Sequence, residues 1–571
     1  MDIILDENFE EDSKCGADVF FKGVTCIERK NPQITFSVKD CINNVYVDVN
    51  IPRTAMEPSN VERAIAINNG VCEDAKSICR NLLKRYNSAL KDGTLHIRYL
   101  HTRLGWHIVD NETVFYGDSI VCKDNAVISS YCGNIDVKPV GDIMNVINMI
   151  KNKIIGVQGW SKLEAVIAFG VGAIVLAYAN IEWNTSFNNI LLHLVGGSTT
   201  GKSTALILFS GLGCNPDPKL GFWISHASTE GSIIKRIGNN NGYPVAIDEI
   251  SAGTRKEYDS FVYTIGNGEE KDRLKPGGIG LQDSVTFQTA VLSSGEVSLL
   301  KKCSKNEGIR ARCIEFANVY WTESKQQSIA IKECMKSNHG LVAPMVAKEL
   351  IANGDKWKER WEFWRKKVDA KISKDKICLS IGGRVADYVA LFTLAAEIAN
   401  VVLDIELNVN EIFKFCYEYI IIANEEEANL AVRAYSAIVE YISRNRDRFA
   451  DATFFGGSRS MYDDVTLDTN QDGFYHNVRR KTINGNVYDM VYVFRMGAME
   501  NILADAGFAD AKVSLFKLRE AGYLKTKDNN RNTYSYTING STQKCIAVYF
   551  RDETMDGCSF DDGRINPFMA L

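Results

Sequence analysis

Apolar and polar positions alternate along the chain in two periods, which predicts a mixed α/β protein. Residues 34–38 and 45–49 alternate with the two-residue period of half-buried strands. Residues 60–68 and 72–86 have the longer spacing of amphipathic helices. Two further strand signals follow at 95–99 and 105–109. These patterns predict a small N-terminal α+β domain.

Strand and helix signals then alternate from about residue 140 to 345, which predicts a mostly parallel sheet flanked by helices. The pattern is helical from about 345 to 430, including residues 384–400, and mixed after that. The predicted domains are 1–135 (N-terminal α+β), 136–345 (α/β core), 346–430 (helical) and 431–571 (mixed).

One apolar run, residues 165–178, resembles a membrane span but is shorter than the roughly 20 residues that a bilayer requires. Glu164 precedes it, and Asn180 and Glu182 follow. We therefore expect a buried helix beside the core and no membrane association.

Composition narrows the class of protein. Of 571 residues, 45% are hydrophobic and 24% charged, as in ordinary globular proteins. The net charge of −5 means that any DNA contact must use local basic patches. Fifteen cysteines without a C-x-x-C pair, together with an acidic N-terminus unlike an export signal, predict free thiols in a cytoplasmic protein.

The strongest motif lies between an apolar strand at 190–195 and a helix at 204–212. It reads G-x-x-x-x-G-K-S, the pattern of a phosphate-binding loop, in which backbone N–H groups and the helix N-terminus surround the phosphates. Lys202 would reach the β- and γ-phosphates, and Ser203 would hold Mg²⁺. The predicted ATP-binding residues are Gly196, Gly197, Ser198, Thr199, Thr200, Gly201, Lys202, Ser203 and Thr204.

A second apolar strand, residues 243–247, ends in Asp248 and Glu249. We expect this strand beside the one that feeds the loop. Asp248 would then meet the Mg²⁺ shell, and Glu249 would polarise the attacking water.

Two further segments offer candidates for catalysis. The strand at 286–292 leads to Ser293 and Ser294, either of which can touch the γ-phosphate or position the water. Arg310 and Arg312 precede another strand, and one of them can act across a subunit boundary as an arginine finger. The spacing along the sequence does not show which of the two serines, or which of the two arginines, has the catalytic role.

These motifs together resemble one family of mobile-element AAA+ ATPases, described as "superfamily II helicase". It includes the self-loading Cch helicases of staphylococcal cassette chromosomes and is similar to MCM replicative helicases. The likeness covers about residues 30–425 and is strongest over 190–320. The motifs are residues 194–203, 229–231, 247–249, 266–268 with Lys271 and Arg273, and 292–296.

The resemblance implies further roles. The serine after the third strand would be sensor 1, and Arg384, which opens a lid helix, would be sensor 2. A hairpin before the sensor 1 strand would project into a central pore. Lys271, Arg273 and Lys275 would there hold DNA phosphates, although the intervening acidic residues depart from the family's pattern.

The C-terminal region has the order of a winged helix: helices at 499–506 and 511–522, a basic turn at 525–531, then a strand at 533–538. We expect an apolar face of Val513, Leu515, Phe516 and Leu518, with Lys512, Ser514, Lys517 and Arg519 in solvent. Lys512, Lys517 and Lys527 would contact DNA, although such modules also dock proteins.

The sequence thus predicts an α/β fold with an AAA+ phosphate-loop core, a helical lid, an N-terminal α+β domain and a C-terminal winged helix. The expected function is an ATP- and Mg²⁺-dependent DNA helicase or translocase of a mobile element that forms a homo-oligomeric, hexameric ring and works with a separate primase. The alternatives are an ATP-switched DNA-binding initiator or regulator, and a defence ATPase that acts on a protein.

Overall fold

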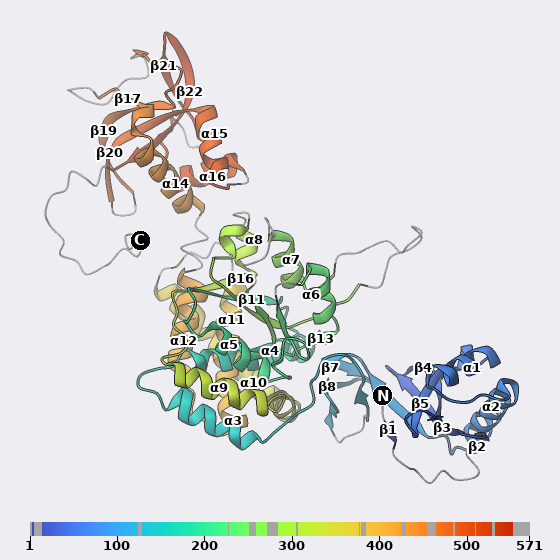
Figure 1. Cartoon of the computed structure of the whole chain (residues 1–571). Coiled ribbons are helices and arrows are strands. Elements are labelled where there is room, and N and C mark those ends of the chain that lie inside the picture. The colour runs from blue at the N-terminus through green and yellow to red at the C-terminus, as the bar shows by residue number, and fades with distance from the viewer. Residues whose placement is uncertain are drawn as a thin grey trace. The chain divides into compact units, whose positions relative to one another are not determined.

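The computed structural model describes residues 3–4, 14–123, 128–225, 228–249, 258–270, 284–303, 307–375, 377, 384–423, 430–453, 464–483, 486–508, 510–527 and 531–551. The chain divides into two compact units (Figure 1). Unit 1 comprises residues 1–299, 312–377 and 383–419, and unit 2 comprises 300–311, 378–382 and 420–571.

Unit 1 begins with a sheet whose strand order is β1-β5-β4-β3-β6-β10, with β2 paired to β3. Helices α1 (Pro58–Ile67) and α2 (Ala75–Lys91) cover one face of this sheet, where Ile78 and Leu82 pack against Ile34 and Phe36. The predicted α+β organisation is therefore present. The strands are β1 (Ile3–Ile4), β2 (Lys14–Gly16), β3 (Val19–Ile27), β4 (Lys30–Asp40), β5 (Val45–Pro52), β6 (Ile97–His101) and β10 (Ser130–Tyr131).

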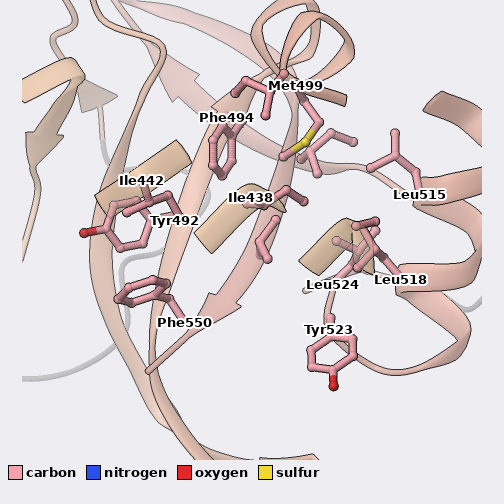
Figure 2. Close-up of a cluster of buried hydrophobic side chains, with 14 of the residues drawn as sticks. Ile438, Ile442, Tyr492, Phe494, Met499, Leu515, Leu518, Tyr523, Leu524 and Phe550 are labelled. Carbon is pink, nitrogen blue, oxygen red and sulfur yellow. The ribbon is translucent and has the colours of Figure 1, made fainter. Parts of the chain in front are cut away.

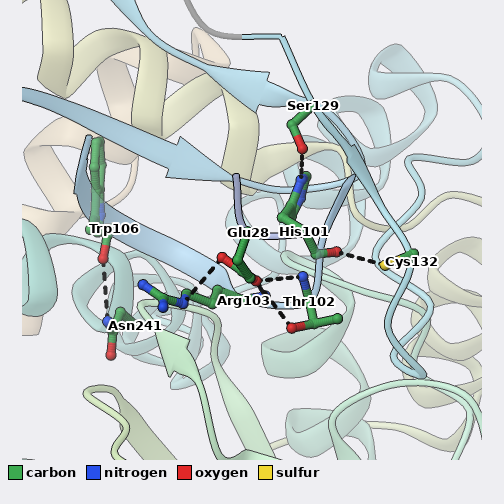
Figure 3. A network of polar contacts seen from close by, with 8 residues as sticks. All are labelled: Glu28, His101, Thr102, Arg103, Trp106, Ser129, Cys132 and Asn241. Atoms are coloured by element: carbon green, nitrogen blue, oxygen red, sulfur yellow. Dashed lines mark hydrogen bonds and ion pairs between the residues drawn. The ribbon is translucent and has the colours of Figure 1, made fainter. Parts of the chain in front are cut away.

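A second, smaller sheet has the order β13-β7-β8-β9 and joins distant parts of the sequence. Its strands are β7 (Leu104–Val109), β8 (Glu112–Tyr116), β9 (Ile120–Val121) and β13 (Asn240–Asn241). Figure 3 shows Asn241 donating from Nδ2 to the carbonyl oxygen of Trp106, 3.3 Å away, and Glu28 binding Thr102 and Arg103 at the entry to β7. Trp106 also donates from Nε1 to the carbonyl of Ile174, so this sheet is tied to the helix that carries Ile174.

The central sheet is fully parallel, with the order β12-β14-β15-β11-β16. Its strands are β11 (Ile190–Val195), β12 (Trp223–Ser225), β14 (Val245–Asp248), β15 (Ala290–Gly295) and β16 (Cys313–Ala317). The strand ending in Asp248 was predicted to lie beside the strand that feeds the loop, and this is wrong. Strand β15 separates them, because a parallel strand needs a crossover connection and a crossover can pass over a neighbouring position in the sheet.

Helices pack around this sheet as the alternating pattern predicts. The buried helix expected at 165–178 is α4 (Leu163–Glu182), which packs against α5, α10, α11 and β15. By length and hydropathy α4 and residues 385–403 of α11 could each span a bilayer, but 89% and 72% of their apolar windows are buried inside the protein. The helices here are α3 (Ile143–Ile150), α5 (Lys202–Gly211), α6 (Glu230–Ile237), α7 (Asp259–Asn267), α9 (Lys325–Ser337), α10 (Val342–Lys374), α11 (Arg384–Leu403) and α12 (Val409–Cys416).

Unit 2 holds a six-stranded sheet of order β17-β19-β20-β22-β21-β18, and helices α14, α15 and α16 pack against it. Figure 2 shows their shared core, where Ile438 and Met499 lie beside Phe494 and Leu515. The elements are α8 (Glu307–Arg310), α14 (Leu430–Arg444), β17 (Phe449–Asp451), β18 (Asp464–Val465), β19 (Gly473–Ile483), β20 (Asn486–Arg495), α15 (Met496–Asp505), α16 (Ala511–Glu520), β21 (Tyr534–Ile538) and β22 (Ser541–Phe550).

Candidate active site

The phosphate-loop motif connects β11 to α5 at the carboxyl edge of the central sheet. Thr199 and Gly201 have positive φ angles of 80° and 88°, so the chain turns sharply before the helix. A Cβ at Gly201 would lie 2.5 Å from Oγ1 and 2.7 Å from the backbone nitrogen of Thr322. Only glycine satisfies both the backbone conformation and the close approach at this position.

Lys202 lies inside the curve of this loop. Its side chain is buried, and Nζ donates to the carbonyl oxygens of Gly196 at 2.6 Å and Gly197 at 2.7 Å. The first turn of α5 therefore brings a cation and the helix N-terminus to one concave loop. That combination suits a polyphosphate.

Neighbouring elements hold the remaining loop residues. The backbone nitrogen of Gly196 donates to the carbonyl of Gly295, and the carbonyl of Thr200 accepts from the backbone nitrogen of Trp321. The hydroxyl of Ser198 donates to Oε1 of Glu296, at 3.2 Å. Within α5, Ser203 is partly exposed, whereas Thr204 is buried and its hydroxyl bonds that of Ser328 at 2.6 Å.

Asp248 is the last residue of β14, and Glu249 follows it, at the same edge of the sheet. Ser294 of β15 joins them: its hydroxyl donates to Oδ1 of Asp248 at 2.8 Å and accepts from the backbone nitrogen of Glu249 at 3.1 Å. Glu249 has a φ of 56°, a left-handed conformation that costs a non-glycine residue about 1 kcal/mol or more. Its carboxylate also accepts from the backbone nitrogen of Glu296, at 3.4 Å. Ser294 thus holds the carboxylate of Asp248 and the backbone of Glu249 relative to the loop strand beside it.

Ser293 points to the opposite face of β15 and bonds a histidine. Its hydroxyl lies 2.8 Å from Nδ1 of His193, whose Nε2 lies 3.3 Å from the carbonyl oxygen of Val297. A carbonyl can only accept, so Nε2 carries the proton and Nδ1 accepts from Ser293. Burial lowers the pKa of His193 to about 4, so the ring is neutral at pH 7. Of the two serines, only Ser294 faces the carboxylates.

The side chains predicted to hold Mg²⁺ suit that ion chemically. Ser203 offers a hydroxyl oxygen and Asp248 a carboxylate, both partly exposed, and Mg²⁺ prefers one or two such oxygen ligands with phosphate and water completing the shell. Ser203 lies in the first turn of α5, which follows the carboxyl end of β11 through the loop, and Asp248 is the last residue of β14, so both stand at the carboxyl edge of the parallel sheet.

The two candidate finger arginines differ in exposure. Arg310 ends α8 and is only 8% exposed. Arg312 precedes β16, is partly exposed, stacks over Tyr263 at 5.0 Å and donates to Oδ1 of Asn267 at 3.2 Å. A residue that reaches across a subunit boundary must stand at the surface, so exposure favours Arg312.

Four other predicted residues cannot be placed in the same way. Arg384 is the first residue of α11, as the lid-helix prediction requires, but its side chain lies outside the described residues. Lys271, Arg273 and Lys275 also lie outside the described residues.

In unit 2, α16 has a different buried face from the one predicted. Ser514 is 1% exposed, whereas Val513 and Phe516 are 47% and 40% exposed. The stripe that contacts the core is Ser514, Leu515 and Leu518, which follows the i, i+1, i+4 spacing of a 3.6-residue period. Of the three predicted DNA contacts here, Lys512 and Lys527 are exposed and Lys517 is partly exposed, with Nζ 3.3 Å from Glu520.

The structure also reveals a basic hairpin that the sequence reasoning missed. Strands β19 and β20 pair antiparallel, their register shifts between Asn477 and Lys481, and Arg479 and Arg480 within that interval are exposed. Ile483, near the turn, lies 3.9 Å from a Cβ built on Gly522, just beyond α16. Three consecutive cations in an alternating strand, residues 479–481, were the signal that could have identified it.

Comparisons with known proteins fit this architecture. Residues 50–278 match DUF927, a domain of unknown function, and residues 429–553 match the Cch helix turn helix domain. No curated protein matches the chain. The solved structure titled "SCCmec type IV Cch - active helicase" is similar over 93% of both chains, at 20% identity and a TM-score of 0.72.

A second solved structure, the apo C-terminal region of NrS-1, is 10% identical and covers 71% of this chain and 92% of its own, but its TM-score of 0.23 carries no argument. The resemblance predicted from the motifs is confirmed: the chain has a fold similar to that of a Cch-type helicase of staphylococcal cassette chromosomes, and residues 429–553 match the Cch helix turn helix domain.

Proposed function

We propose that the protein is an ATP-dependent DNA helicase or translocase of a mobile genetic element, with an AAA+ core at residues 136–345. The observation that carries the proposal is the hydroxyl of Ser294, which binds both Asp248 and Glu249 beside the strand that feeds the phosphate loop. A loop that suits a polyphosphate and a fixed pair of carboxylates are the two parts that ATP hydrolysis requires.

Each residue then has a defined role. Lys202 and the backbone of the loop bind the β- and γ-phosphates, while Ser203 and Asp248 hold Mg²⁺, which would neutralise phosphate charge. Glu249 orients the attacking water, and its carboxylate is held by the backbone nitrogen of Glu296. Ser294 keeps Glu249 in position and serves as sensor 1.

The DNA-contacting part of the proposal rests on unit 2. Residues 430–551 contain 17 Lys and Arg against 13 Asp and Glu, although the whole chain has a net charge of −5. Lys512, Lys517 and Lys527 on or near α16, with the β19–β20 hairpin, would contact the phosphate backbone, while Lys271, Arg273 and Lys275 would do so in the pore.

The remaining parts of the proposal concern assembly. Arg312 would complete the ATP site of a neighbouring copy in a hexameric ring, and Arg384 would act from a lid formed by residues 346–430. A separate primase would work with the ring in the cytoplasm. The resemblance to Cch-type helicases supports these assignments.

The decisive test combines three measurements on the full chain. We expect ATPase activity that single-stranded DNA stimulates, ATP-dependent strand displacement on a forked duplex, and a hexameric mass in solution with Mg²⁺·ATP. ATP binding with neither turnover nor strand displacement would instead identify an ATP-switched initiator or regulator.

A further inference from the structure

The outer face of α2, in the N-terminal sheet domain, carries an unusual line of positive charge. Its 17 residues include five Lys or Arg and no Asp or Glu. Its inner face, with Ile78, Cys79 and Leu82, is buried in the core that this domain shares. Figure 1 shows α2, in blue, beside the strands of the N-terminal sheet. The exposed cations of this face, called the α2 stripe below, are Lys76, Arg80, Lys84 and Lys91.

The spacing puts these four side chains on one line. At 3.6 residues per turn they fall within an arc of about 80°, and at 1.5 Å per residue the line is about 22 Å long. Asn87 is the exposed residue between Lys84 and Lys91 in the same arc.

Among the residues that the structure describes, no carboxylate neutralises the α2 stripe. No ion pair joins its four residues to an acidic side chain within the described ranges. At the two ends of the helix, Asp74 is bound to the backbone nitrogens of Lys76 and Ser77, and Asp92 accepts from Ser88. Like charges at i, i+4 cost a helix about 0.2–0.5 kcal/mol per pair. Repulsion between the cations on the outer face therefore destabilises this helix, and burial of the apolar inner face offsets that cost.

A long, straight row of charge is complementary to a linear polyanion and not to a small anion, which would need convergent donors in a pocket. One DNA strand in a duplex places a phosphate about every 3.4 Å, so the stripe spans roughly six phosphates. A lipid surface fits less well, because a membrane-bound helix inserts its apolar face, and here that face is buried in the protein core.

We propose that the α2 stripe is a binding surface for the phosphate backbone of DNA, separate from the pore and from the helix-turn-helix domain. Only the choice of DNA as the polyanion rests on the proposed function. The N-terminal domain would hold DNA without reading its sequence, since phosphate contacts carry no base information.

The test uses the full chain with the triple change Lys76→Gln, Arg80→Gln and Lys84→Gln, which keeps helix propensity nearly constant. The control triple, Lys336→Gln, Lys348→Gln and Lys366→Gln, removes the same charge from exposed positions elsewhere in unit 1. Binding to labelled single-stranded and duplex oligonucleotides is measured by fluorescence anisotropy across a salt series. ATPase activity without DNA checks that the variants fold.

We expect the negative slope of the logarithm of the DNA-binding constant against the logarithm of salt concentration to become shallower in the stripe variant. The change should be about 2 for single strands or about 3 for duplex, and the control should show no such change. The larger change identifies the DNA form that the stripe holds. A stripe variant whose slopes equal those of the control overturns the inference. Loss of binding to phosphatidylserine vesicles with unchanged DNA slopes overturns it in favour of a membrane. If the wild-type protein itself binds no DNA, the proposed function fails instead.

Discussion

Ser293 and Ser294 are neighbours in one strand with opposite surroundings, which makes them a matched pair for testing the proposed active site. The hydroxyl of Ser294 bonds Asp248 at 2.8 Å and the backbone nitrogen of Glu249 at 3.1 Å. The hydroxyl of Ser293 bonds His193 on the other face of the sheet. Ser294→Ala should therefore disturb the two carboxylates, and Ser293→Ala should not.

The size of the effect follows from the lost contacts. A hydrogen bond to a charged group contributes about 1.5–3 kcal/mol, and Glu249 occupies a left-handed conformation that Ser294 helps to hold. If the displacement of Glu249 raises the barrier by about 2–3 kcal/mol, turnover falls ~30- to 150-fold. ATP affinity should stay close to wild type, because the phosphate loop is untouched.

The assay is single-turnover release of phosphate from bound ATP, with ATP affinity measured separately. Ser294→Thr keeps the hydroxyl and should recover most of the rate, while Ser293→Ala serves as the structural control. Equal rates for Ser294→Ala and Ser293→Ala would refute the argument, since then the two hydrogen bonds would not position the catalytic carboxylate.

Four further outcomes are expected. Lys202→Ala should abolish ATP binding in a titration, since it removes the cation inside the loop. Glu249→Gln should bind ATP but release no phosphate, because an amide cannot accept the proton of the water. Arg312→Ala should lower turnover by up to ~10³-fold and recover partly when mixed with Lys202→Ala protein, whereas Arg310→Ala should mainly lower stability. The wild-type protein should lose about 1.4 kcal/mol of unfolding free energy between pH 7.5 and 5.5 because of His193, and His193→Gln should not show this loss. The measurement is urea unfolding followed by tryptophan fluorescence.

The sign of the last effect follows from the lowered pKa. Burial lowers the pKa of His193 from 6.5 to about 4, so between these values the unfolded chain binds a proton that the folded chain does not. The contribution of His193 to the free energy of unfolding is therefore fully present above about pH 6.5 and is lost as the pH falls below that value. All eight tryptophans lie between residues 106 and 364, so their fluorescence reports on unit 1 alone. An equal pH dependence in His193→Gln would assign the loss to another group.

The sequence was sufficient for motifs that are continuous in the chain. The loop at 196–203 is fixed by local chemistry, since glycines, a lysine and a helix start must follow one another. The carboxylate pair at the end of β14 is equally local. The order of strands is not local: every strand of a buried parallel sheet is a similar apolar run, so periodicity could not reveal that β15 separates β14 from β11.

The choice between Ser293 and Ser294 shows the same limit on a smaller scale. Alternation in a strand predicts that the two side chains face opposite sides, but it cannot predict which side holds the carboxylates. That answer required the register of Ile247 with Ser293 and the position of His193 on β11.

In α16 the error had a different cause, since the required information was in the sequence. The predicted face, residues 513, 515, 516 and 518, joined the most apolar side chains without following one helical stripe. A strict 3.6-residue period selects residues 511, 514, 515 and 518, with a serine in the buried row, and this is the row that the core contains. Ser514 is accommodated there because its hydroxyl donates to the carbonyl of Asp510, so burial leaves this hydroxyl paired.

The same rotation of the helix leaves Phe516 exposed beside Arg519, which stacks over its ring at 4.8 Å. The solvent face of this helix therefore combines cations with an aromatic ring, a surface that can stack as well as bind phosphates.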